Sequence, residues 1–297
     1  MNETTFDIII VGAGSAGCVL ANRLSENPKR RVLVLEAGPA DTNPWIHIPI
    51  GYYRTMYDPH ISWGYETEPV PGAAVRRLSW PRGKVVGGCS SINGLVYARG
   101  QREDFDHWRQ LGNVGWGYDD VLPYFRKAEG TTVEAWDTRF HGRDGPLGVA
   151  KASARKLCDA YIAAAAQAGI PTNEDYNGSA QEGAGYFQVT ARNGWRSRAA
   201  SAYLKPASKR PNLKIQTDTL VRRLLFEGKR VVGVETLRDG HEETIKVTRD
   251  VVLSAGAINS PQLLQLSGIG VELDEAIAEA NPYSGDRLQL RMQGTPA

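Results

Sequence analysis

The chain has 297 residues, of which 41% are hydrophobic and 23% are charged, and its formal net charge is +2. Such values are typical of a soluble globular protein; they exclude a disordered, collagen-like or disulfide-stapled chain and predict no nucleic-acid partner. The three cysteines, Cys18, Cys89 and Cys158, are spaced for neither a disulfide framework nor a zinc site, so we expect a reducing compartment and no bound metal. No apolar stretch approaches the ~18 residues of a membrane span, and the N-terminus lacks a signal-peptide pattern.

The first elements predict a βαβ unit. The apolar run DIIIV leads into a glycine turn, a helical pattern over residues 16–25 and a second apolar run, VLVLE. From Pro39 to about Arg82 the chain is rich in proline, glycine, tryptophan and tyrosine and lacks periodicity. This segment predicts a covering excursion of loops and short strands.

Helices and then strands follow. A helical pattern begins after Gly87, and three further helices are predicted at REDFDHWRQLG, which ends at Gly112 as a C-cap, YDDVLPYFRKAEG and ARKLCDAYIAAAAQAG. Between Leu213 and Ala255 four strand-like runs follow one another: LKIQT, LVRRLLFEGKRVVGVETL, which folds back at its EG pair, EETIKVT and DVVLSAG. These runs predict a meander that feeds a final core strand.

Gly12, Gly14 and Gly17 fit the pattern G-x-G-x-x-G in the context that it requires, after a strand and before a helix. The first glycine permits a tight turn, the second lets the backbone approach a pyrophosphate, and the third packs helix on strand, with the helix N-terminus facing the anion. Glu36 closes the second strand, where a carboxylate can accept hydrogen bonds from an adenosine ribose. We therefore predict dinucleotide binding, with a glycine turn of another α/β fold as the alternative.

NAD and FAD share this mode of binding, and later segments favour FAD. DVVLSAG ends at Ala255 and Gly256 and is followed by AINSPQLLQLSGIG, a strand, glycine turn and helix in the layout of FAD-binding folds. A nicotinamide-dependent dehydrogenase, the less favoured alternative, would continue with further βα repeats. Gly87, Gly88 and Cys89, followed by two serines, offer backbone amides and hydroxyls suited to a pyrophosphate or a flavin, and an ordinary serine-capped loop is the alternative.

These stretches together resemble the glucose-methanol-choline (GMC) family of FAD-dependent oxidoreductases. GKVVGGCSSINGLVYARG is similar to the first signature of the family and GAINSPQLLQLSGIG to the second. Further similar stretches, among them RNGWRSRAASAYL, extend the resemblance over residues 5–270, and it is strongest to the choline dehydrogenase and alcohol dehydrogenase branch. The resemblance implies oxidation of a primary alcohol, choline or an aliphatic alcohol, to the aldehyde by hydride transfer to flavin N5. It also implies that electrons pass to an acceptor other than NAD, such as a quinone or a dye.

The resemblance implies a noncovalently bound FAD and the residues that hold it. Ser15 and Ala16 would meet the pyrophosphate, Glu36 the ribose, and the backbone of Val221 the adenine. The complete predicted set is Gly12, Gly14, Ser15, Ala16, Gly17, Glu36, Ala37, Val85, Gly87, Gly88, Cys89, Asn93, Gly94, Leu95, Val96, Val221, Ala255 and Gly256. Cys89 stands where serine is commoner, and its backbone amide can serve in the same way. The GGCSSIN stretch contains no histidine, so no covalent histidyl-flavin is expected.

Alcohol oxidation needs a base that titrates near the working pH, a task that suits histidine. In the family this histidine, beside a second histidine or an asparagine, lies far toward the C-terminus, and no residue of this chain matches it. We therefore predict no catalytic residue here; His107 is expected to be a surface or packing residue, and His47 is the histidine to test. The chain is expected to be the FAD-binding half of an alcohol dehydrogenase, weakly active or inactive alone, with a noncatalytic flavin-binding remnant as the alternative.

The predicted organisation is α/β with α+β elements in the insertions. A discontinuous, Rossmann-like FAD-binding domain is predicted at residues 1–40, 78–110 and 190–270, and a covering loop region at 41–77. Residues 111–189 are predicted to be part of a helical substrate-side insertion that belongs to an incomplete substrate-binding domain. Residues 271–297 are predicted to form an atypical tail. After Gly270 the expected helix, strand and glycine turn are replaced, which predicts a local deletion or frame disturbance followed by early termination. We expect a small-molecule alcohol and an electron acceptor as partners, and a cytoplasmic location with peripheral contact to the inner membrane as the alternative.

Overall fold

The structure, a computed structural model, describes residues 5–69, 72 and 74–270. They divide into two compact units: unit 1 takes the described residues up to Asn93 and from Ala199 onward, and unit 2 takes Gly94–Arg198. These boundaries differ from the predicted ones near residues 110 and 190, and the predicted roles of the parts stay predictions. The predicted tail and the disturbance after Gly270 lie outside the described residues.

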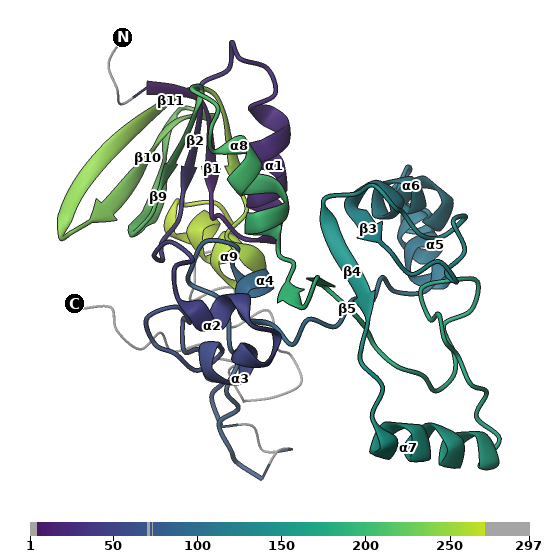
Figure 1. Ribbon diagram of the computed structural model, residues 1–297. Helices are drawn as coiled ribbons and strands as arrows, with labels where there is room; N and C mark the ends of the chain where they lie inside the picture. The colour runs from purple at the N-terminus through teal and green to yellow at the C-terminus, as the bar shows by residue number, and fades with distance from the viewer. Residues whose placement is uncertain (1–4, 70–71, 73, 271–297) are drawn as a thin grey trace. The chain divides into compact units, whose positions relative to one another are not determined.

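A six-stranded sheet forms the frame of unit 1 (Figure 1). Its strand order is β8-β2-β1-β11-β10-β9, and the bounds in that order are Leu213–Gln216, Val32–Leu35, Thr5–Val11, His241–Leu253, Arg230–Arg238 and Thr219–Glu227. The first four strands pair in parallel, and β10 and β9 extend the sheet in antiparallel fashion. The predicted parallel sheet with a meander is confirmed, as is the βαβ unit at its centre.

β11 is longer than the sequence predicts. Its first part pairs antiparallel with β10 and its second part pairs parallel with β1, so the runs EETIKVT and DVVLSAG, predicted as separate strands, belong to one strand. The physical reason is twofold. The residues between Val247 and Asp250 include no glycine or proline to turn the chain, and a register shift between Phe6 and Ile8 of β1 accommodates the change of partner.

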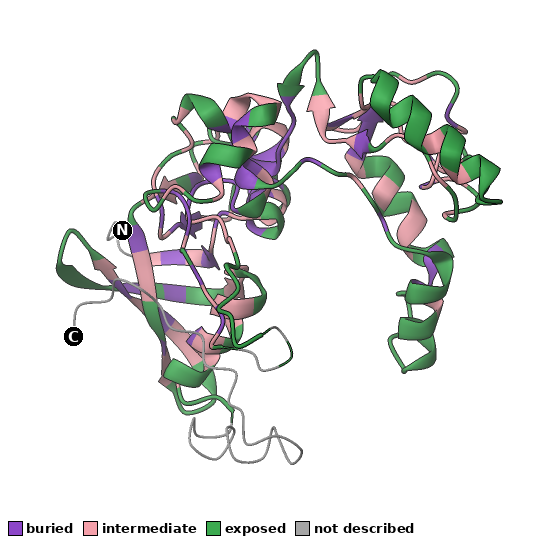
Figure 2. Cartoon of the chain, turned by 90° about the horizontal axis from the view of Figure 1, so that it is seen from below, coloured by how far each residue is buried: buried purple, intermediate pink, exposed green. Residues whose placement is uncertain are grey.

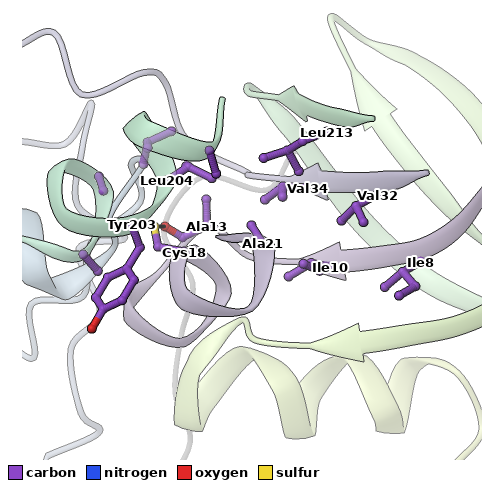
Figure 3. Close-up of a cluster of buried hydrophobic side chains, with 14 residues drawn as sticks. Ile8, Ile10, Ala13, Cys18, Ala21, Val32, Val34, Tyr203, Leu204 and Leu213 are labelled. Carbon is purple, nitrogen blue, oxygen red and sulfur yellow. Dashed lines mark hydrogen bonds between the residues drawn. The ribbon is translucent and has the colours of Figure 1, made fainter. Parts of the chain in front are cut away.

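Helices pack on both faces of this sheet. Those of unit 1 that cover it are α1 (Ser15–Leu24), η3 (Ala200–Leu204), α8 (Lys205–Ala207) and α9 (Gly256–Leu266). Because side chains alternate along a strand, Ile8 and Ile10 face α1, η3 and α8 (Figure 3), whereas Ile9 and Val11 join the cluster that contains Leu263 of α9. Each such fully buried aliphatic side chain stabilises the fold by about 1.5–3 kcal/mol.

The excursion after β2 contains short helices, where the sequence predicts loops and short strands. They are α2 (Pro44–His47), η1 (Pro49–Gly51) and α3 (Tyr52–Thr55), and α4 (Cys89–Ile92) follows the later glycine pair. The Asn43 side chain accepts a hydrogen bond from the N–H of Trp45, and Pro44 occupies the first helical position, which is a strong local start signal. The later, described residues of the excursion pair through isolated β-bridges and single backbone hydrogen bonds, such as that from the N–H of Trp63 to the carbonyl of Arg82.

Unit 2 consists of helices around two small sheets. Its elements are α5 (Arg102–Gln110), α6 (Tyr118–Ala128), β3 (Glu129–Thr131), β4 (Leu147–Lys151), α7 (Lys156–Gln167), β5 (Gln188–Val189), β6 (Ala191–Arg192) and β7 (Trp195–Arg196). The three predicted helices are confirmed, although Leu111 is the C-cap of α5 and Gly112, at φ +98°, is the residue after it. α7 has no buried residue (Figure 2). No helix in the described ranges is long and apolar enough to cross a membrane.

Candidate cofactor site

The first glycine turn joins β1 to α1, and its three glycines differ in backbone geometry and in the space around them. Gly12 has φ +95° and donates its N–H to the carbonyl of Leu35 at 2.7 Å. A Cβ on Gly17 would lie 1.9 Å from the carbonyl oxygen of Gly12, so only glycine lets the helix approach the strand. A Cβ on Gly14 would meet no atom closer than 3.8 Å. The backbone at Gly14 is therefore open to a ligand, as the fingerprint predicts.

Glu36 follows β2 directly and its side chain is buried. Its carboxylate accepts hydrogen bonds from the N–H of Ala13 at 2.8 Å and of Gly38 at 3.0 Å. Burial raises the pKa of Glu36 to about 7, and the two backbone hydrogen bonds oppose this rise. A carboxylate can accept about four hydrogen bonds, so the group that fixes the glycine turn keeps acceptor capacity for ribose hydroxyls.

The second glycine stretch packs directly on the first. Gly87 donates its N–H to the carbonyl of Ala13 at 2.7 Å, and a Cβ on Gly88 would lie 2.8 Å from the Cα of Gly14. Gly88 is the N-cap of α4, so a helix starts where the sequence predicts one. The hydroxyls of Ser90 and Ser91 donate to backbone carbonyls of their own loop, and their predicted contact with a ligand stays a prediction. The stretch contributes backbone to the site.

A third wall comes from the turn between β11 and α9. Ala255 donates its N–H to Ser260 Oγ at 3.1 Å, and the residues from Ala255 to Ser260 face the same cavity as Gly14. Ser254 Oγ is buried, and no residue in the described part of the chain offers it a hydrogen bond. A buried hydroxyl without a partner is uncommon, and it indicates a group that a ligand satisfies.

These walls enclose a cavity of about 950 Å³. It lies where β1, β2 and β11 end, since Val11, Leu35 and Leu253 all line it, and ligands of open α/β sheets bind beyond such carboxyl ends. Of the predicted cofactor residues, those that line it are Gly12, Gly14, Ser15, Ala16, Glu36, Ala37, Gly88, Cys89, Val221, Ala255 and Gly256.

Seven predicted residues do not line this cavity. Gly17, Val85, Gly87 and Asn93 belong to unit 1 and lie outside the lining, and Gly94, Leu95 and Val96 belong to unit 2. Gly17 and Gly87 shape the two glycine turns, and Val85 is fully buried in an apolar cluster with Ile46, Ile61 and Ile92. Their contacts with a cofactor stay predictions.

Other lining residues were not singled out from the sequence. Trp63 and Arg82 come from the covering excursion, Arg222, Arg223 and Glu235 from β9 and β10, and Asn259 from α9. Asn259 stands inside the stretch that resembles the second family signature, so that stretch already contained its signal. Trp63 and Arg82 carry no comparable signal, because their approach depends on pairing within an aperiodic segment.

Among the described residues, no histidine lines this cavity. His107 is exposed, in agreement with its predicted surface role, and His47 is partly buried in α2, outside the lining. His141 is buried in unit 2, between carboxylates of Glu129 and Asp175. Within the described ranges, no group of three or more His, Cys, Asp and Glu side chains could hold a metal ion.

Comparisons with known proteins agree on the family. A family model described as GMC oxidoreductase matches residues 6–293. The mitochondrial choline dehydrogenase of Mus musculus is 50% identical over an aligned length of 305 residues. The match covers 98% of this chain and 50% of that protein. The oxygen-dependent choline dehydrogenase of Rhizobium etli is 47% identical over 295 residues, covering 97% of this chain and 53% of that protein.

Solved structures share the fold. Pyridoxine 4-oxidase from Mesorbium loti superposes with a TM-score of 0.84 at 38% identity, over 89% of this chain and 52% of that one. An FAD-dependent oxidoreductase from Chaetomium thermophilum has a TM-score of 0.82 at 33% identity, over 92% of this chain and 49% of that one.

The parallel sheet, the glycine turns and the cavity at the strand ends define a Rossmann-like, FAD-binding fold of the α/β class. The chain belongs to the GMC oxidoreductase family, whose cofactor is FAD. It spans about half the length of the curated relatives it matches. The family match continues beyond Gly270, where the resemblance read from the sequence ends.

The cavity fits FAD on three grounds that come from this structure. Its floor is glycine backbone: a side chain at Gly14 would extend into the space that a dinucleotide needs, and Gly88 is packed against Gly14, where a Cβ would lie 2.8 Å from the Gly14 Cα. Its wall holds the unpartnered hydroxyl of Ser254. Its volume of about 950 Å³ is also at the upper end of the roughly 300–1,000 Å³ usual for small-molecule sites, as a large cofactor requires.

Proposed function

We propose that this chain is the FAD-binding half of a flavin-dependent alcohol dehydrogenase, and that it holds FAD noncovalently in the cavity of unit 1. The observation that carries the proposal is the meeting of two glycine stretches and three strand ends around that one cavity. The backbone at Ser15 and Ala16, at the N-terminus of α1, binds the pyrophosphate. Glu36 accepts from the adenosine ribose, and the Val221 backbone contacts the adenine.

The flavin end is assigned to residues from the second glycine stretch. Val85 and Cys89 contact the flavin, and Asn93 follows its ring and ribityl chain. Cys89 acts through its backbone amide, because its thiol lies 3.5 Å from the N–H of Gly83 and accepts from it. Support comes from Gly88 and Cys89 in the cavity lining.

The substrate class follows from the relatives. Choline dehydrogenases are among them, so we propose a primary alcohol, choline or an aliphatic alcohol, that is oxidised to the aldehyde. FAD, when bound, supplies the two-electron acceptor for this oxidation. The chain's own residues bind and orient the dinucleotide and exclude water from its buried part. Electrons then pass to a non-NAD acceptor such as a quinone, in the cytoplasm or at the inner membrane surface.

The proposal is tested by titrating the purified apoprotein with FAD and following quenching of flavin fluorescence. Gly14→Val is the informative variant, because its Cβ meets no neighbour closer than 3.8 Å and so spares the fold while blocking backbone approach. Gly72→Val is the matched control, since Gly72 is exposed and has nothing within 4 Å of the added Cβ. We expect saturable FAD binding that Gly14→Val abolishes and Gly72→Val retains. If the unsubstituted chain does not bind FAD, the proposal is wrong.

A noncatalytic flavin-binding remnant is the second candidate function. It is favoured by the observation that, within the part of the chain that the structure describes, no histidine that could serve as base lines the cavity. The two candidates are separated by dye reduction with the FAD-loaded chain and choline or a medium-chain alcohol. Turnover, even if weak, supports the dehydrogenase half and contradicts the remnant, which predicts none.

A further inference from the structure

Tyr65 is the largest of the fully buried side chains in the described part of the chain, and it belongs to the arm, defined here as the described residues of 61–84. The two sides of the arm pair through their backbones: Trp63 N–H donates to the Arg82 carbonyl at 2.9 Å, and Trp80 N–H donates to the Tyr65 carbonyl at 2.7 Å. Trp63 and Arg82, at the base of the arm, line the cavity. The arm base is therefore a wall of the cofactor site.

The Tyr65 hydroxyl connects this wall to α9. It donates to Asn259 Oδ1 at 2.7 Å, across 194 residues of sequence, and Asn259 also lines the cavity. Burial raises the pKa of Tyr65 to about 12, so the hydroxyl keeps its proton and remains a donor at any physiological pH. The ring is stacked on Trp63, with centroids 5.8 Å apart and planes 14° from parallel, which fixes its direction.

This bond determines which way the Asn259 amide points. An amide oxygen that accepts from a hydroxyl places the amide NH₂ on the opposite branch of the side chain. In the described part of the chain, Tyr65 is the one hydrogen-bond partner recorded for the Asn259 side chain. Its two N–H donors are thus available on the wall of a cavity that fits a ligand rich in phosphate and carbonyl acceptors.

We propose that Tyr65 is a positioning residue for the cofactor: it holds Asn259 in the orientation in which the Asn259 amide donates to bound FAD. This inference rests on the proposed FAD binding. A side chain that is fixed before binding loses little rotamer freedom when the ligand binds. Tyr65 can therefore tighten FAD binding by fixing Asn259, without contacting FAD itself. Losing one neutral hydrogen bond with its preorganisation corresponds to about a 5- to 10-fold weaker affinity.

The test uses four variants and one control in the whole chain. Tyr65→Phe removes the donor, and Asn259→Asp keeps an acceptor for Tyr65 but has no N–H to donate. Asn259→Ala and the double variant Tyr65→Phe/Asn259→Ala complete a cycle. Tyr203→Phe is the control, because Tyr203 is also a buried tyrosine of unit 1 and does not line the cavity.

The first readout is the FAD dissociation constant. Tyr65→Phe is expected to weaken binding about 5- to 10-fold, Asn259→Asp at least as much, and Tyr203→Phe not at all. The double variant should bind as Asn259→Ala does, because Tyr65 acts only through Asn259. The proposal is overturned when Tyr65→Phe binds like the unsubstituted chain, when Asn259→Asp keeps full affinity, or when Tyr65→Phe still weakens binding in the Asn259→Ala background.

The second readout needs no cofactor. Amide hydrogen exchange of apoprotein segment 256–262 should accelerate in Tyr65→Phe and stay unchanged in Tyr203→Phe, since the bond anchors the first turns of α9. Unchanged exchange overturns the positioning role even in a chain that binds no FAD, whereas failure of the unsubstituted chain to bind FAD counts against the proposed function. If Tyr65→Phe does not fold, exchange of the same segment in Asn259→Ala decides in its place.

Discussion

Unit 1 buries mainly aliphatic side chains, whereas unit 2 buries a connected set of charged and polar ones. In unit 1, Ile9, Ile10 and Leu33 are fully buried within two apolar clusters on the two faces of the sheet. In unit 2, Glu129, His141 and Gln188 are the largest fully buried side chains. The two units are therefore stabilised by different physical interactions.

The buried network of unit 2 is linked pair by pair. Arg99 forms an ion pair with Glu129, and His141 Nδ1 lies 2.7 Å from the other carboxylate oxygen of Glu129. His141 Nε2 lies 2.9 Å from Asp175 Oδ1, which also accepts from Gln188 Nε2 at 2.7 Å. Such charges are tolerated inside a protein only when each finds its partner.

The difference has a functional meaning. Apolar burial is non-directional, so the strands and helices of unit 1 can be held firmly while the backbone at Gly14 stays open to a cofactor. An ionic network is directional and holds loops in a fixed arrangement, at the risk that the loss of one member leaves others unpaired. Unit 1 should therefore tolerate conservative changes that unit 2 does not.

The largest effect is expected from Glu129→Gln. The substitution keeps the shape of the side chain but leaves the Arg99 charge buried without its counter-ion, which costs about 3–5 kcal/mol of unfolding free energy. Urea unfolding measures the loss, and hydrogen exchange should locate it in residues 94–198. Glu174→Gln is the control, because the Glu174 side chain is 85% exposed and its pair with Lys151 contributes about 1 kcal/mol or less. A Glu129→Gln protein as stable as the control would show that the network contributes nothing.

Leu33 tests the apolar side of the comparison. Leu33→Ala should cost about 2–5 kcal/mol, because it removes a fully buried side chain and leaves a cavity. Leu33→Met, which conserves volume, should cost less than about 1.5 kcal/mol. Chemical denaturation of both proteins gives the two values. If Leu33→Met is as damaging as Leu33→Ala, then the interior of unit 1 is no more tolerant than that of unit 2.

The two units should also respond in opposite directions to pH. Burial raises the pKa of Glu36 from 4.5 to about 7, so the contribution of Glu36 to the stability of unit 1 is fully present below pH 4.5 and falls by up to about 3 kcal/mol as the pH rises through 7. Burial raises the pKa of Asp175, but the hydrogen bond to His141 and the charge of His141 lower it. The lowering effects are together larger, so the pKa of Asp175 lies below its ordinary value of 3.8. Its contribution to unit 2 is present above pH 3.8 and is lost as the pH falls through the lowered pKa.

Hydrogen exchange at a series of pH values, read separately for the two units, checks these slopes. Glu36→Gln should flatten the slope of unit 1 between pH 4.5 and 7 and leave unit 2 unchanged. FAD should bind more tightly above pH 7, because ribose hydroxyls donate to the ionised carboxylate. Equal slopes in both units, or an affinity for FAD that rises toward pH 5, would contradict the assignment of Glu36.

The sequence allows prediction of the parts of the site that local patterns determine. The glycine spacing after an apolar run predicts the turn at Gly12, and the position of Glu36 at the end of the next strand places its carboxylate beside that turn. Both follow from geometry within a βαβ unit of fewer than forty residues. The signature-like stretches extend this to Gly88 and Gly256, which also line the cavity.

What could not be predicted depends on contacts between distant segments. The bond from Tyr65 to Asn259 spans 194 residues, and Arg99 and Gln188 reach the buried carboxylates of unit 2 from separate segments. Nothing in the residues around His141 distinguishes a buried network histidine from an exposed one such as His107. The continuity of β11 was missed for the same reason, since its partner changes from β10 to β1 along its length.

The smallest loss of unfolding free energy is expected from Arg223→Gln. This variant tests whether burial, rather than charge alone, makes the ion pairs of unit 2 more important for stability than an exposed ion pair of unit 1. Arg223 of β9 and Glu235 of β10 are cross-strand partners, with Nη2 2.8 Å and Nε 3.0 Å from the same Glu235 oxygen. The Arg223 side chain is 56% exposed, so solvent and salt screen the pair, and its loss should cost about 0.2–1 kcal/mol. Urea unfolding at low and high salt should show this small cost shrinking further as salt rises. A salt-independent cost as large as that of Glu129→Gln would mean that the ion pair itself, rather than its burial, sets the energy of the network in unit 2.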